Sequence, residues 1–419
     1  MKKIVNIGVI GYGNVGSAVV KLVQKNSGII LKKTGIDLKI KAIADVAPDK
    51  KHPLIVRDAN KIINDPEISI IVEAIGKEEA ALKIIMAAFN AKKHVVTPNK
   101  ELLSKHLSIL QKAANKNGVS LLFEAAVGGG IPIIRVLSEN LAANNITEIY
   151  GIVNGTTNYI LSKMSQSNLS FEQALTQAKH KGFAEPNPSA DIDGADALYK
   201  SVILASVAYG EEIDYSKVYA EGISKIKAED IRFADEIGYV IKLLAIAKKL
   251  DNQIEVRVHP TLVPKNHALA NVSDNFNAIY VKGDAVGELM FYGQGAGGNP
   301  TASAIVGDII AIAEKGQVSL LPAEMPKAQL KDINEIESRY YVRLTAPDKH
   351  GVLSGISGAF AKEKVSIQAV MQKENIGNTA TIVIIIHKVP EKNMNAALAR
   401  IRKLSVVKEV CNCIRVGLD

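Results

Sequence analysis

Gly11-Tyr12-Gly13-Asn14-Val15-Gly16 is the stretch of this 419-residue chain that decides its fold. It directly follows the apolar run Val5 to Ile10 and opens a helical pattern, so we expect a strand before it and a helix after it. In that setting Gly11 makes a tight turn, Gly13 lets backbone N–H groups approach a pyrophosphate, and Gly16 allows close packing of helix on strand. The expected dinucleotide-binding residues are Gly11, Gly13, Asn14, Val15 and Gly16.

The region around this loop, residues 1–130, alternates short apolar runs with helical patterns. The further apolar runs are Ile36 to Ala44, Ile70 to Ala74, His94 to Thr97 and Ser120 to Phe123. The helical patterns include Ser17 to Lys25 and Glu78 to Asn90. This alternation predicts an α/β fold, a Rossmann-type parallel sheet with helices on both faces.

The rest of the chain divides into two further regions. Residues 131–313 mix strand-like runs (Glu148 to Val153, Gln253 to Leu262) with helix-like ones (Phe171 to Lys179, Asp196 to Tyr209, Ala234 to Leu250), which predicts a separate α+β domain. Residues 314–338 contain Gly316, Pro322 and Pro326 without a sustained period, as a linker does. Beyond them, residues 339–419 read as β-α-β-β-α-β, the ferredoxin-like order.

Composition excludes several classes of protein. Hydrophobic residues make up 47% and charged residues 22%, as in a globular protein with a large core. The net charge of +8 comes from lysines interleaved with acids, which argues against nucleic-acid binding. No apolar stretch approaches the roughly 18 residues of a membrane span. Cys411 and Cys413 are the only cysteines and cannot complete a zinc site, so we expect a reduced, cytoplasmic protein, with an inter-subunit disulfide or redox role as the alternative.

Asp45 ends the second predicted strand. A carboxylate there accepts hydrogen bonds from the adenosine ribose hydroxyls and repels a 2′-phosphate, which favours NAD. Lys50, Lys51 and Arg57 follow closely and offer a partner to that phosphate, so NADP also remains open. The distance from the glycine loop to Asp45 exceeds the typical one of about 20 residues, which an insertion at residues 26–35 explains.

Three polar segments follow predicted strands. Thr97-Pro98-Asn99-Lys100 places Thr97 and Lys100 at the carboxyl end of a parallel strand, where ligands bind, although Asn99 capping a helix with a solvated Lys100 explains it equally well. The glycines of residues 124–132 leave carbonyl groups able to turn toward a ligand, or form a hinge. Residues 154–158, including Thr157, supply small groups for a polar substrate, or a plain helix cap.

The stretch from Gly182 to Lys200 concentrates carboxylates beside a lysine. If it enters a helix, Asp196 and Lys200 are four residues apart on one face, within reach of an ion pair. A lysine held near acids stays cationic, as is needed to give a proton to an oxygen that gains charge when a carbonyl receives hydride. Glu185, Asp191 and Asp193 would supply negative charge for a substrate ammonium.

At these residues the chain resembles the homoserine dehydrogenases. The resemblance covers nearly the whole length and includes the glycine loop, Thr97 to Lys100, Glu124 to Pro132, Asn154 to Asn158, Glu185 to Lys200, Gly295 to Gly297 and Pro300-Thr301. It implies the reversible reduction of L-aspartate 4-semialdehyde to L-homoserine with NAD or NADP, in threonine and methionine biosynthesis. Lys200 then corresponds to the proton donor, although Lys100 is also a candidate for moving the proton.

The resemblance also assigns binding roles. Glu185 falls where the family binds the substrate amino group, Asp191 and Asp196 lie in the same pocket, and Lys100 sits between nicotinamide and substrate. A monovalent cation, sodium, is implied at the backbone of Glu124, Val127, Gly129 and Ile131. Gly295 would cover the cofactor, with residues 295–318 completing the first domain. Many relatives have an arginine where this chain has Ala44, which weakens the expectation of NADP.

The carboxyl-terminal region resembles an ACT domain, on the basis of residues 344–353. Such domains pair side by side, so a homodimer or homotetramer is implied, with L-threonine as the effector. Asp348, Gly351, Val352 and Leu353 would bind it at a helix N-terminus. One alternative is a dimerisation domain that has lost its ligand. Another, for the whole chain, is a sensor that binds cofactor and amino acid without turnover.

Overall fold

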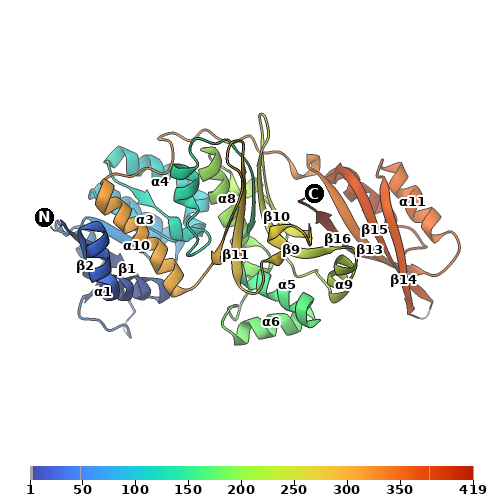
Figure 1. Cartoon of the computed structure of the whole chain (residues 1–419), viewed down its shortest axis with the longest axis horizontal. Helices are drawn as coiled ribbons and strands as arrows, with labels where there is room; N and C mark the ends of the chain where they lie inside the picture. Colours follow the sequence, from blue (N-terminus) through green and yellow to red (C-terminus); the bar gives the residue numbers. More distant parts are fainter. Residues whose placement is uncertain (1–2, 48, 377, 419) are drawn as a thin grey trace. The chain divides into compact units, whose positions relative to one another are not determined.

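The computed structural model describes residues 3–47, 49–376 and 378–418 (Figure 1). Its contacts divide the chain into two compact units, each assembled from three segments. The first unit comprises residues 1–153, 199–218 and 276–328, and the second comprises residues 154–198, 219–275 and 329–419. Because each unit combines segments that are far apart in the sequence, this division does not test the domain limits expected from the sequence, which stay predictions.

A six-stranded parallel sheet forms the core of the first unit, as predicted. Its order is β3-β2-β1-β4-β5-β6. The strands are β1 (Lys3–Ile10), β2 (Ile36–Ala44), β3 (Ile55–Val56), β4 (Ile70–Glu73), β5 (His94–Val96) and β6 (Leu121–Leu122). The order reverses between β1 and β4, and in such sheets ligands bind at the carboxyl ends of the strands beside this reversal.

The helices of this sheet are α1 (Asn14–Thr34), α2 (Asn60–Ile63), α3 (Glu78–Asn90), α4 (Lys100–Asn117) and α10 (Gly298–Lys315). Helix α1 packs on α10, and α3 packs on α4. Residues 26–34, predicted to belong to an insertion, continue α1 and end at Gly35, whose left-handed backbone (φ 73°) closes the helix. The long spacing to Asp45 therefore comes from the length of α1, which has 21 residues.

An antiparallel sheet of β7 (Ile146–Ile152), β11 (Phe276–Gly283) and β12 (Gly287–Gln294) also belongs to the first unit. Two short turns, η1 (Glu124–Ala126) and η2 (Val136–Asn140), lie between β6 and β7. Helix α8 (Ala195–Tyr209) contributes its residues from Tyr199 onward. The predicted strand near 148–153 and the predicted helix at 196–209 are both confirmed.

The second unit contains α5 (Gly155–Ser167), α6 (Phe171–His180), α7 (Ser189–Ile192), α9 (Ala228–Glu236) and the strands β8 (Tyr219–Ala220), β9 (Tyr239–Lys249) and β10 (Ile254–Pro264). The predicted helix over 234–250 is wrong. Gly238, with φ 85°, stops α9, and β9 then pairs antiparallel with β10 over its whole length. Seven consecutive residues of β9 are buried, so its sequence carries no alternation that separates a strand from a helix.

The carboxyl-terminal part of this unit has the predicted β-α-β-β-α-β order. It consists of β13 (Glu337–Pro347), α11 (Val352–Lys362), β14 (Ile367–Ile376), β15 (Thr379–Pro390), α12 (Glu391–Ile401) and β16 (Glu409–Val416). The antiparallel sheet order is β16-β13-β15-β14. Apolar side chains of α11, α12, β13 and β15 form one buried core, with partly buried side chains of β14 and β16 packed against it. Strand β16 also pairs in parallel with β10, which joins this sheet to the β9-β10 pair.

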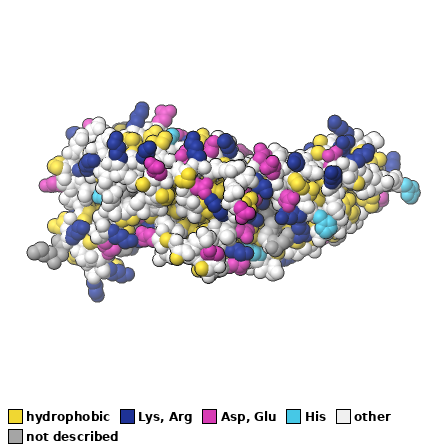
Figure 2. Space-filling model, turned by 90° about the horizontal axis from the view of Figure 1, so that it is seen from above, with side chains coloured by type: hydrophobic (Ala, Val, Ile, Leu, Met, Phe, Trp, Pro, Cys, Tyr) yellow, Lys and Arg dark blue, Asp and Glu magenta, His cyan; other side chains and the backbone are white. Residues whose placement is uncertain are grey.

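The surface carries charges of both signs, as the sequence predicted. Lys and Arg side chains alternate with Asp and Glu over the face shown in Figure 2. Within the described ranges, no helix is both long and apolar enough to span a membrane. Both cysteines are free thiols, and burial raises the pKa of the Cys413 thiol to about 12. That thiol is therefore protonated and a poor nucleophile at neutral pH.

Candidate active site

The glycine loop has the geometry of a phosphate-binding turn. Gly11 has φ 101°, and a Cβ there would lie 2.4 Å from the Ala74 carbonyl oxygen. A Cβ on Gly16 would lie 1.9 Å from the Gly11 carbonyl oxygen, so α1 packs against the loop as closely as glycine allows. Among the residues that the structure describes, apart from its chain neighbours, no atom lies within 4 Å of the corresponding position on Gly13. Open space at Gly13, directly before the positive end of α1, fits a dinucleotide pyrophosphate.

Asp45 braces this loop. Its carboxylate accepts hydrogen bonds from the backbone N–H of Tyr12 (2.7 Å) and of Ala47 (2.8 Å). Arg57 donates to the carbonyl oxygens of Asp45 (2.9 Å) and Ala47 (2.5 Å), so its guanidinium holds the turn after β2. The same turn forms a surface hollow lined by Lys50, Lys51, His52, Pro53, Ile55 and Arg57. A hollow with lysines beside the carboxylate that the sequence predicts to bind ribose suits an anionic group.

A buried carboxylate that sequence reasoning missed lies at the end of β4. Glu73 accepts hydrogen bonds from the Thr97 hydroxyl (2.6 Å) and the Ile75 N–H (2.7 Å), and burial raises its pKa. The sequence signal is an acid that ends an otherwise apolar strand. Thr97 therefore points toward Glu73, and it also receives the N–H of Asn99 (3.0 Å).

The helix-start interpretation of Asn99 and Lys100 holds in part, and the ligand-binding interpretation of Lys100 stays a prediction. Asn99 caps α4 by accepting from the Leu102 N–H at 3.1 Å, as the helix-start interpretation predicted. Lys100 is the first residue of the helix and is half-buried, so it is not the fully solvated side chain which that interpretation expected. It lies just after β5, at the ligand-binding edge of the parallel sheet.

The glycine-rich turn after η1 is held by two buried acids. The Glu124 carboxylate accepts from the backbone N–H groups of Ile133 (2.6 Å), Ile134 (2.7 Å) and Arg135 (3.0 Å). Its own N–H donates to Asp308 at 2.9 Å, and burial together with the Glu124 charge raises the pKa of Asp308 well above its usual range. The Glu124 side chain is therefore structural, and Asp308, a residue of α10, was missed by sequence reasoning.

The predicted cation-binding turn has left-handed backbone at Gly128 (φ 70°) and Gly129 (φ 56°). The Gly128 carbonyl accepts from the Ile131 N–H at 2.9 Å, a bond that closes the turn, and Gly128 is not among the predicted cation ligands. Gly129 approaches Gly295 so closely that a Cβ on Gly129 would lie 2.5 Å from the Gly295 carbonyl oxygen. The structure thus brings together two of the predicted ligand-binding segments.

Lys200 is buried in the first unit and donates a hydrogen bond of 2.7 Å to the Val153 carbonyl oxygen. The helix α8 carries it four residues after Asp196, as the sequence predicted. The arrangement presents a buried cation at the end of β7.

In the second unit, Asn154 gathers two of the predicted substrate-binding carboxylates. Its amide Nδ2 donates to Asp191 (2.7 Å) and to Asp196 (2.8 Å). Its Oδ1 accepts from the Thr157 N–H at 2.8 Å and caps α5, so the helix-cap interpretation is confirmed. The Thr157 hydroxyl also donates to Asn154. Two acids that share one amide form a negative site suited to an ammonium group.

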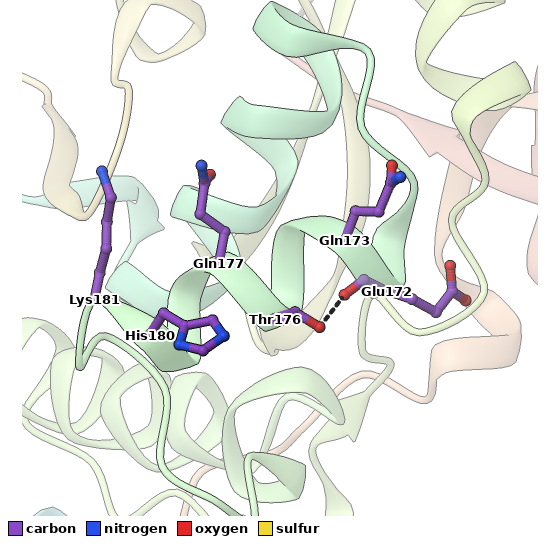
Figure 3. Close-up of a pocket in the computed structure, with 6 residues that line it drawn as sticks. All are labelled: Glu172, Gln173, Thr176, Gln177, His180 and Lys181. Carbon is purple, nitrogen blue, oxygen red and sulfur yellow. Dashed lines mark hydrogen bonds between the residues drawn. The ribbon is translucent and has the colours of Figure 1, made fainter.

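Two other predicted acids lie at the surface. Glu185 and Asp193 are exposed, whereas Asp196 is buried. Among the contacts of the described residues, none joins Glu185 to Asp191 or Asp196. A separate hollow in this unit is lined by one helix only, α6 and its end (Figure 3), with the residues Glu172, Gln173, Thr176, Gln177, His180 and Lys181. It contains none of the predicted site residues and offers a ligand a single wall.

The predicted regulatory residues surround the start of α11. Gly351 caps the helix with φ 86°, Val352 is buried and Leu353 is 44% exposed. Asp348 accepts from the Gln372 amide at 3.1 Å and donates its N–H to the Asn378 carbonyl. A carboxylate and a helix N-terminus are therefore close in sequence and fixed in place.

Three models of known protein families match successive parts of the chain. Family models match residues 11–124 (homoserine dehydrogenase, NAD binding domain), 132–310 (homoserine dehydrogenase) and 340–406 (ACT domain). The homoserine dehydrogenase of Helicobacter pylori is 44% identical over 99% of this chain and 100% of its own length. These matches favour the enzyme over the alternative of a sensor without turnover.

Solved structures agree. A homoserine dehydrogenase from Thiobacillus denitrificans has a TM-score of 0.94 and 39% identity, covering 99% of this chain and 98% of that one. A hyperthermophilic archaeal homoserine dehydrogenase in complex with NADPH has a TM-score of 0.64 and 28% identity, covering 76% of this chain and 99% of that one. With its parallel NAD-binding sheet, buried lysine and ACT domain, the chain belongs to the homoserine dehydrogenases, a family of oxidoreductases.

Proposed function

We propose that Lys200 is the proton donor in the reversible reduction of L-aspartate 4-semialdehyde to L-homoserine. The observation that supports this role is the buried ammonium, oriented by the Val153 carbonyl oxygen at 2.7 Å. A bound nicotinamide supplies the hydride, and the aldehyde oxygen gains negative charge as a result. An ammonium carries three N–H donors, so the bond to Val153 orients it without preventing donation to that oxygen.

Asn154 and its two acids are proposed to bind the substrate ammonium. Asp191 and Asp196 each accept a hydrogen bond from the Asn154 amide, which keeps both carboxylates in place before a ligand binds. Such preorganisation removes the entropy cost of gathering the acids during binding. Glu185 is proposed as a further acid that attracts the ammonium from the exposed segment before α7. Thr157 acts through Asn154, because its hydroxyl is directed to that residue.

Lys100 is proposed to orient the reacting groups and not to transfer the proton. It begins α4 directly after β5, at the edge where the nicotinamide ring of a bound cofactor is expected. A cation there holds a substrate or cofactor oxygen near the reaction. The distinction from Lys200 is testable, because loss of an orienting cation affects KM, whereas loss of the donor affects kcat.

Either NADH or NADPH is proposed to serve as cofactor. Asp45 accepts from backbone N–H groups of the glycine loop and can also accept ribose hydroxyls, which suits NADH. Lys50 and Lys51 line the adjoining hollow and can neutralise the 2′-phosphate of NADPH. Replacing both lysines with alanine is expected to raise KM for NADPH about tenfold and to leave KM for NADH within twofold. Equal changes for both cofactors would contradict the assignment.

Two further ligands are proposed on the strength of family membership. Sodium is assigned to the backbone of Glu124, Val127, Gly129 and Ile131, where the left-handed glycines turn the chain sharply. Activity is expected to be higher in sodium chloride than in choline chloride of equal ionic strength. L-threonine is assigned to Asp348, Gly351, Val352 and Leu353 in a homodimer or homotetramer, and inhibition by L-threonine but not D-threonine, lost in Asp348→Ala, would support it.

The decisive experiment follows the absorbance of NADH or NADPH with L-aspartate 4-semialdehyde. Consumption of either cofactor that depends on the aldehyde supports the proposed reaction. Glyceraldehyde, which lacks the ammonium and carboxylate groups, is the control substrate and is expected to react at least about a hundredfold more slowly, because the paired acids then bind nothing. Failure to consume either cofactor while still binding it would reject the proposal.

A further inference from the structure

Residues 219–223 form a short segment that contacts two distant parts of the second unit. We call it the 219–223 segment. It begins with β8, which pairs in parallel with β10 at Arg257 and Val258, and the Glu221 N–H continues this pairing by donating to the Val258 carbonyl at 2.8 Å. One end of the segment meets the last strand of the ACT domain, and the other meets α7, the helix that carries Asp191.

The contact with the ACT domain is a buried network of charges centred on Arg415 of β16. Arg415 donates to Glu391 through Nε (2.9 Å) and Nη2 (2.6 Å). Its third donor, Nη1, reaches the Glu221 carboxylate at 2.9 Å. The guanidinium lies 4.9 Å from the ring centre of Tyr219, and the Tyr219 hydroxyl donates to Glu221 at 3.0 Å. Glu391 receives a further bond from Tyr340 of β13 at 2.8 Å.

The contact with α7 is backbone against backbone. The Ile223 N–H donates to the Ile192 carbonyl oxygen at 2.8 Å. A Cβ on Gly222 would lie 1.9 Å from that same oxygen and 2.5 Å from the Asp193 Cα, so only glycine permits this approach. Ile192 is the last residue of α7 and directly follows Asp191, whose carboxylate binds the Asn154 amide. A displacement of the segment therefore moves the helix end next to Asp191.

We propose that Glu221 is a positioning residue for the amino-acid substrate. Held by Arg415, it fixes the 219–223 segment, the segment fixes the end of α7, and α7 fixes the Asp191 carboxylate on Asn154. Hydrogen bonds, joined by short lengths of backbone, thereby connect the ACT domain to Asp191 within the second unit. This inference rests on the proposed role of Asp191 in binding the substrate ammonium.

Glu221 is a better position for the test than Arg415. Its side chain is 23% exposed, whereas those of Arg415 and Glu391 are each 7% exposed. Removing Arg415 would leave Glu391 buried without its cation, which destabilises a fold strongly. Removing Glu221 leaves the Arg415–Glu391 pair intact, so the protein is expected to fold. The substitution then affects the position of the 219–223 segment.

The test uses the full-length chain with the substitutions Glu221→Ala, Glu221→Gln, Gly222→Ala and Asp191→Ala. Asp235→Ala is the matched control, because Asp235 forms an exposed ion pair with Lys265 in the same unit, at 2.7 Å. For each variant, kcat and the KM values for L-aspartate 4-semialdehyde and NADPH are measured, and thermal unfolding is followed by circular dichroism.

Glu221→Ala and Gly222→Ala are each expected to raise KM for the semialdehyde about tenfold, with KM for NADPH and kcat within about twofold. Glu221→Gln retains an oxygen that accepts from Arg415 and is expected to recover most of the loss. Asp235→Ala is expected to match the wild type. An unchanged KM for the semialdehyde in Glu221→Ala would overturn the proposal. So would changes of equal size in kcat and in the KM values for the semialdehyde and NADPH.

The outcomes also separate this inference from the proposed function beneath it. A wild-type protein without turnover overturns both. Turnover with an Asp191→Ala variant that binds the semialdehyde normally overturns the role of Asp191 and the inference with it. Turnover with a raised KM in Asp191→Ala and a normal KM in Glu221→Ala overturns the inference alone.

Discussion

The Lys200 ammonium donates a hydrogen bond to the carbonyl oxygen of Val153 at 2.7 Å. The next residue, Asn154, holds Asp191 and Asp196 through its amide. One peptide unit therefore separates the group that orients the proposed proton donor from the group that orients the proposed substrate-binding acids. Val153 directly follows β7, which is hydrogen-bonded to β11 along most of its length, so the carbonyl that binds Lys200 follows a well-supported strand.

Lys200→Met is expected to lower kcat by at least about a hundredfold, because methionine fills the same space and has no proton to give. Cofactor binding should survive, and it can be followed by the fluorescence of NADPH. Lys217→Met, at a lysine whose side chain is 70% exposed, is the control. A Lys200→Met enzyme that keeps its kcat, while Lys100→Met loses it, would transfer the role of donor to Lys100.

Asn154→Ala is expected to raise KM for the semialdehyde more than tenfold. Each acid loses a hydrogen bond that is worth about 1.5–3 kcal/mol because one partner is charged, and the two carboxylates then repel each other. The variant also loses the cap of α5, which costs about 1 kcal/mol of stability. Asn168→Ala, at the residue that ends the same helix, serves as the control, because it changes the helix without touching the acids. Similar KM values in the two variants would refute the role of Asn154.

Local rules predicted the glycine loop, and long-range packing explains what they missed. The turn at Gly11, the approach at Gly16 and the order of the ACT elements follow from residues within one or two elements of each other. Glu73 had a sequence signal, an acid at the end of an apolar strand, but its burial could not be predicted from neighbouring residues, and Asp308 had no such signal. A carboxylate becomes a buried group only when strands or helices far along the chain cover it. The same reason explains the wrong helix over 234–250, because its residues form a strand that pairs with β10 and packs against α5 and α9.

Gly16→Ala and Gly13→Ala form a matched pair in one loop. At Gly16 the added methyl group would lie 1.9 Å from the Gly11 carbonyl oxygen, so α1 must move away from the loop. Gly16→Ala is expected to lower the free energy of unfolding by several kcal/mol, on the order of an overpacked core. Gly13→Ala meets no protein atom within 4 Å and should leave the unfolding free energy of the free protein within about 1 kcal/mol.

Cofactor affinity then distinguishes the two effects. Gly13→Ala is expected to weaken NADPH binding at least about tenfold, because the methyl group occupies the space proposed for the pyrophosphate. Calorimetric titration of NADPH into both variants and the wild type measures this affinity. Unchanged affinity in Gly13→Ala would place the pyrophosphate elsewhere, whatever happens to Gly16→Ala.

Lys242 gives a pH dependence of stability that is separate from catalysis. It is buried on β9 and donates to the Val272 carbonyl (2.5 Å) and the Asn158 amide oxygen (3.3 Å), and burial lowers its pKa to about 8 from 10.5. Between these two values the unfolded chain binds the proton and the folded chain does not. The contribution of Lys242 to stability therefore rises as pH increases from about 8 to 10.5 and is least favourable below 8.

Urea unfolding of the wild type and Lys242→Met across this pH range isolates the contribution. The difference in unfolding free energy between the two proteins is expected to shift in favour of the wild type by about 3 kcal/mol as pH rises. Tyrosines and the other lysines titrate in both proteins, so their contributions to the unfolding free energy cancel in the difference. Lys265→Met, at a lysine whose side chain is 45% exposed in the same unit, is the control and should show no such shift. A flat difference for Lys242→Met would mean that the ammonium keeps its ordinary pKa, with its two carbonyl partners offsetting the cost of burial.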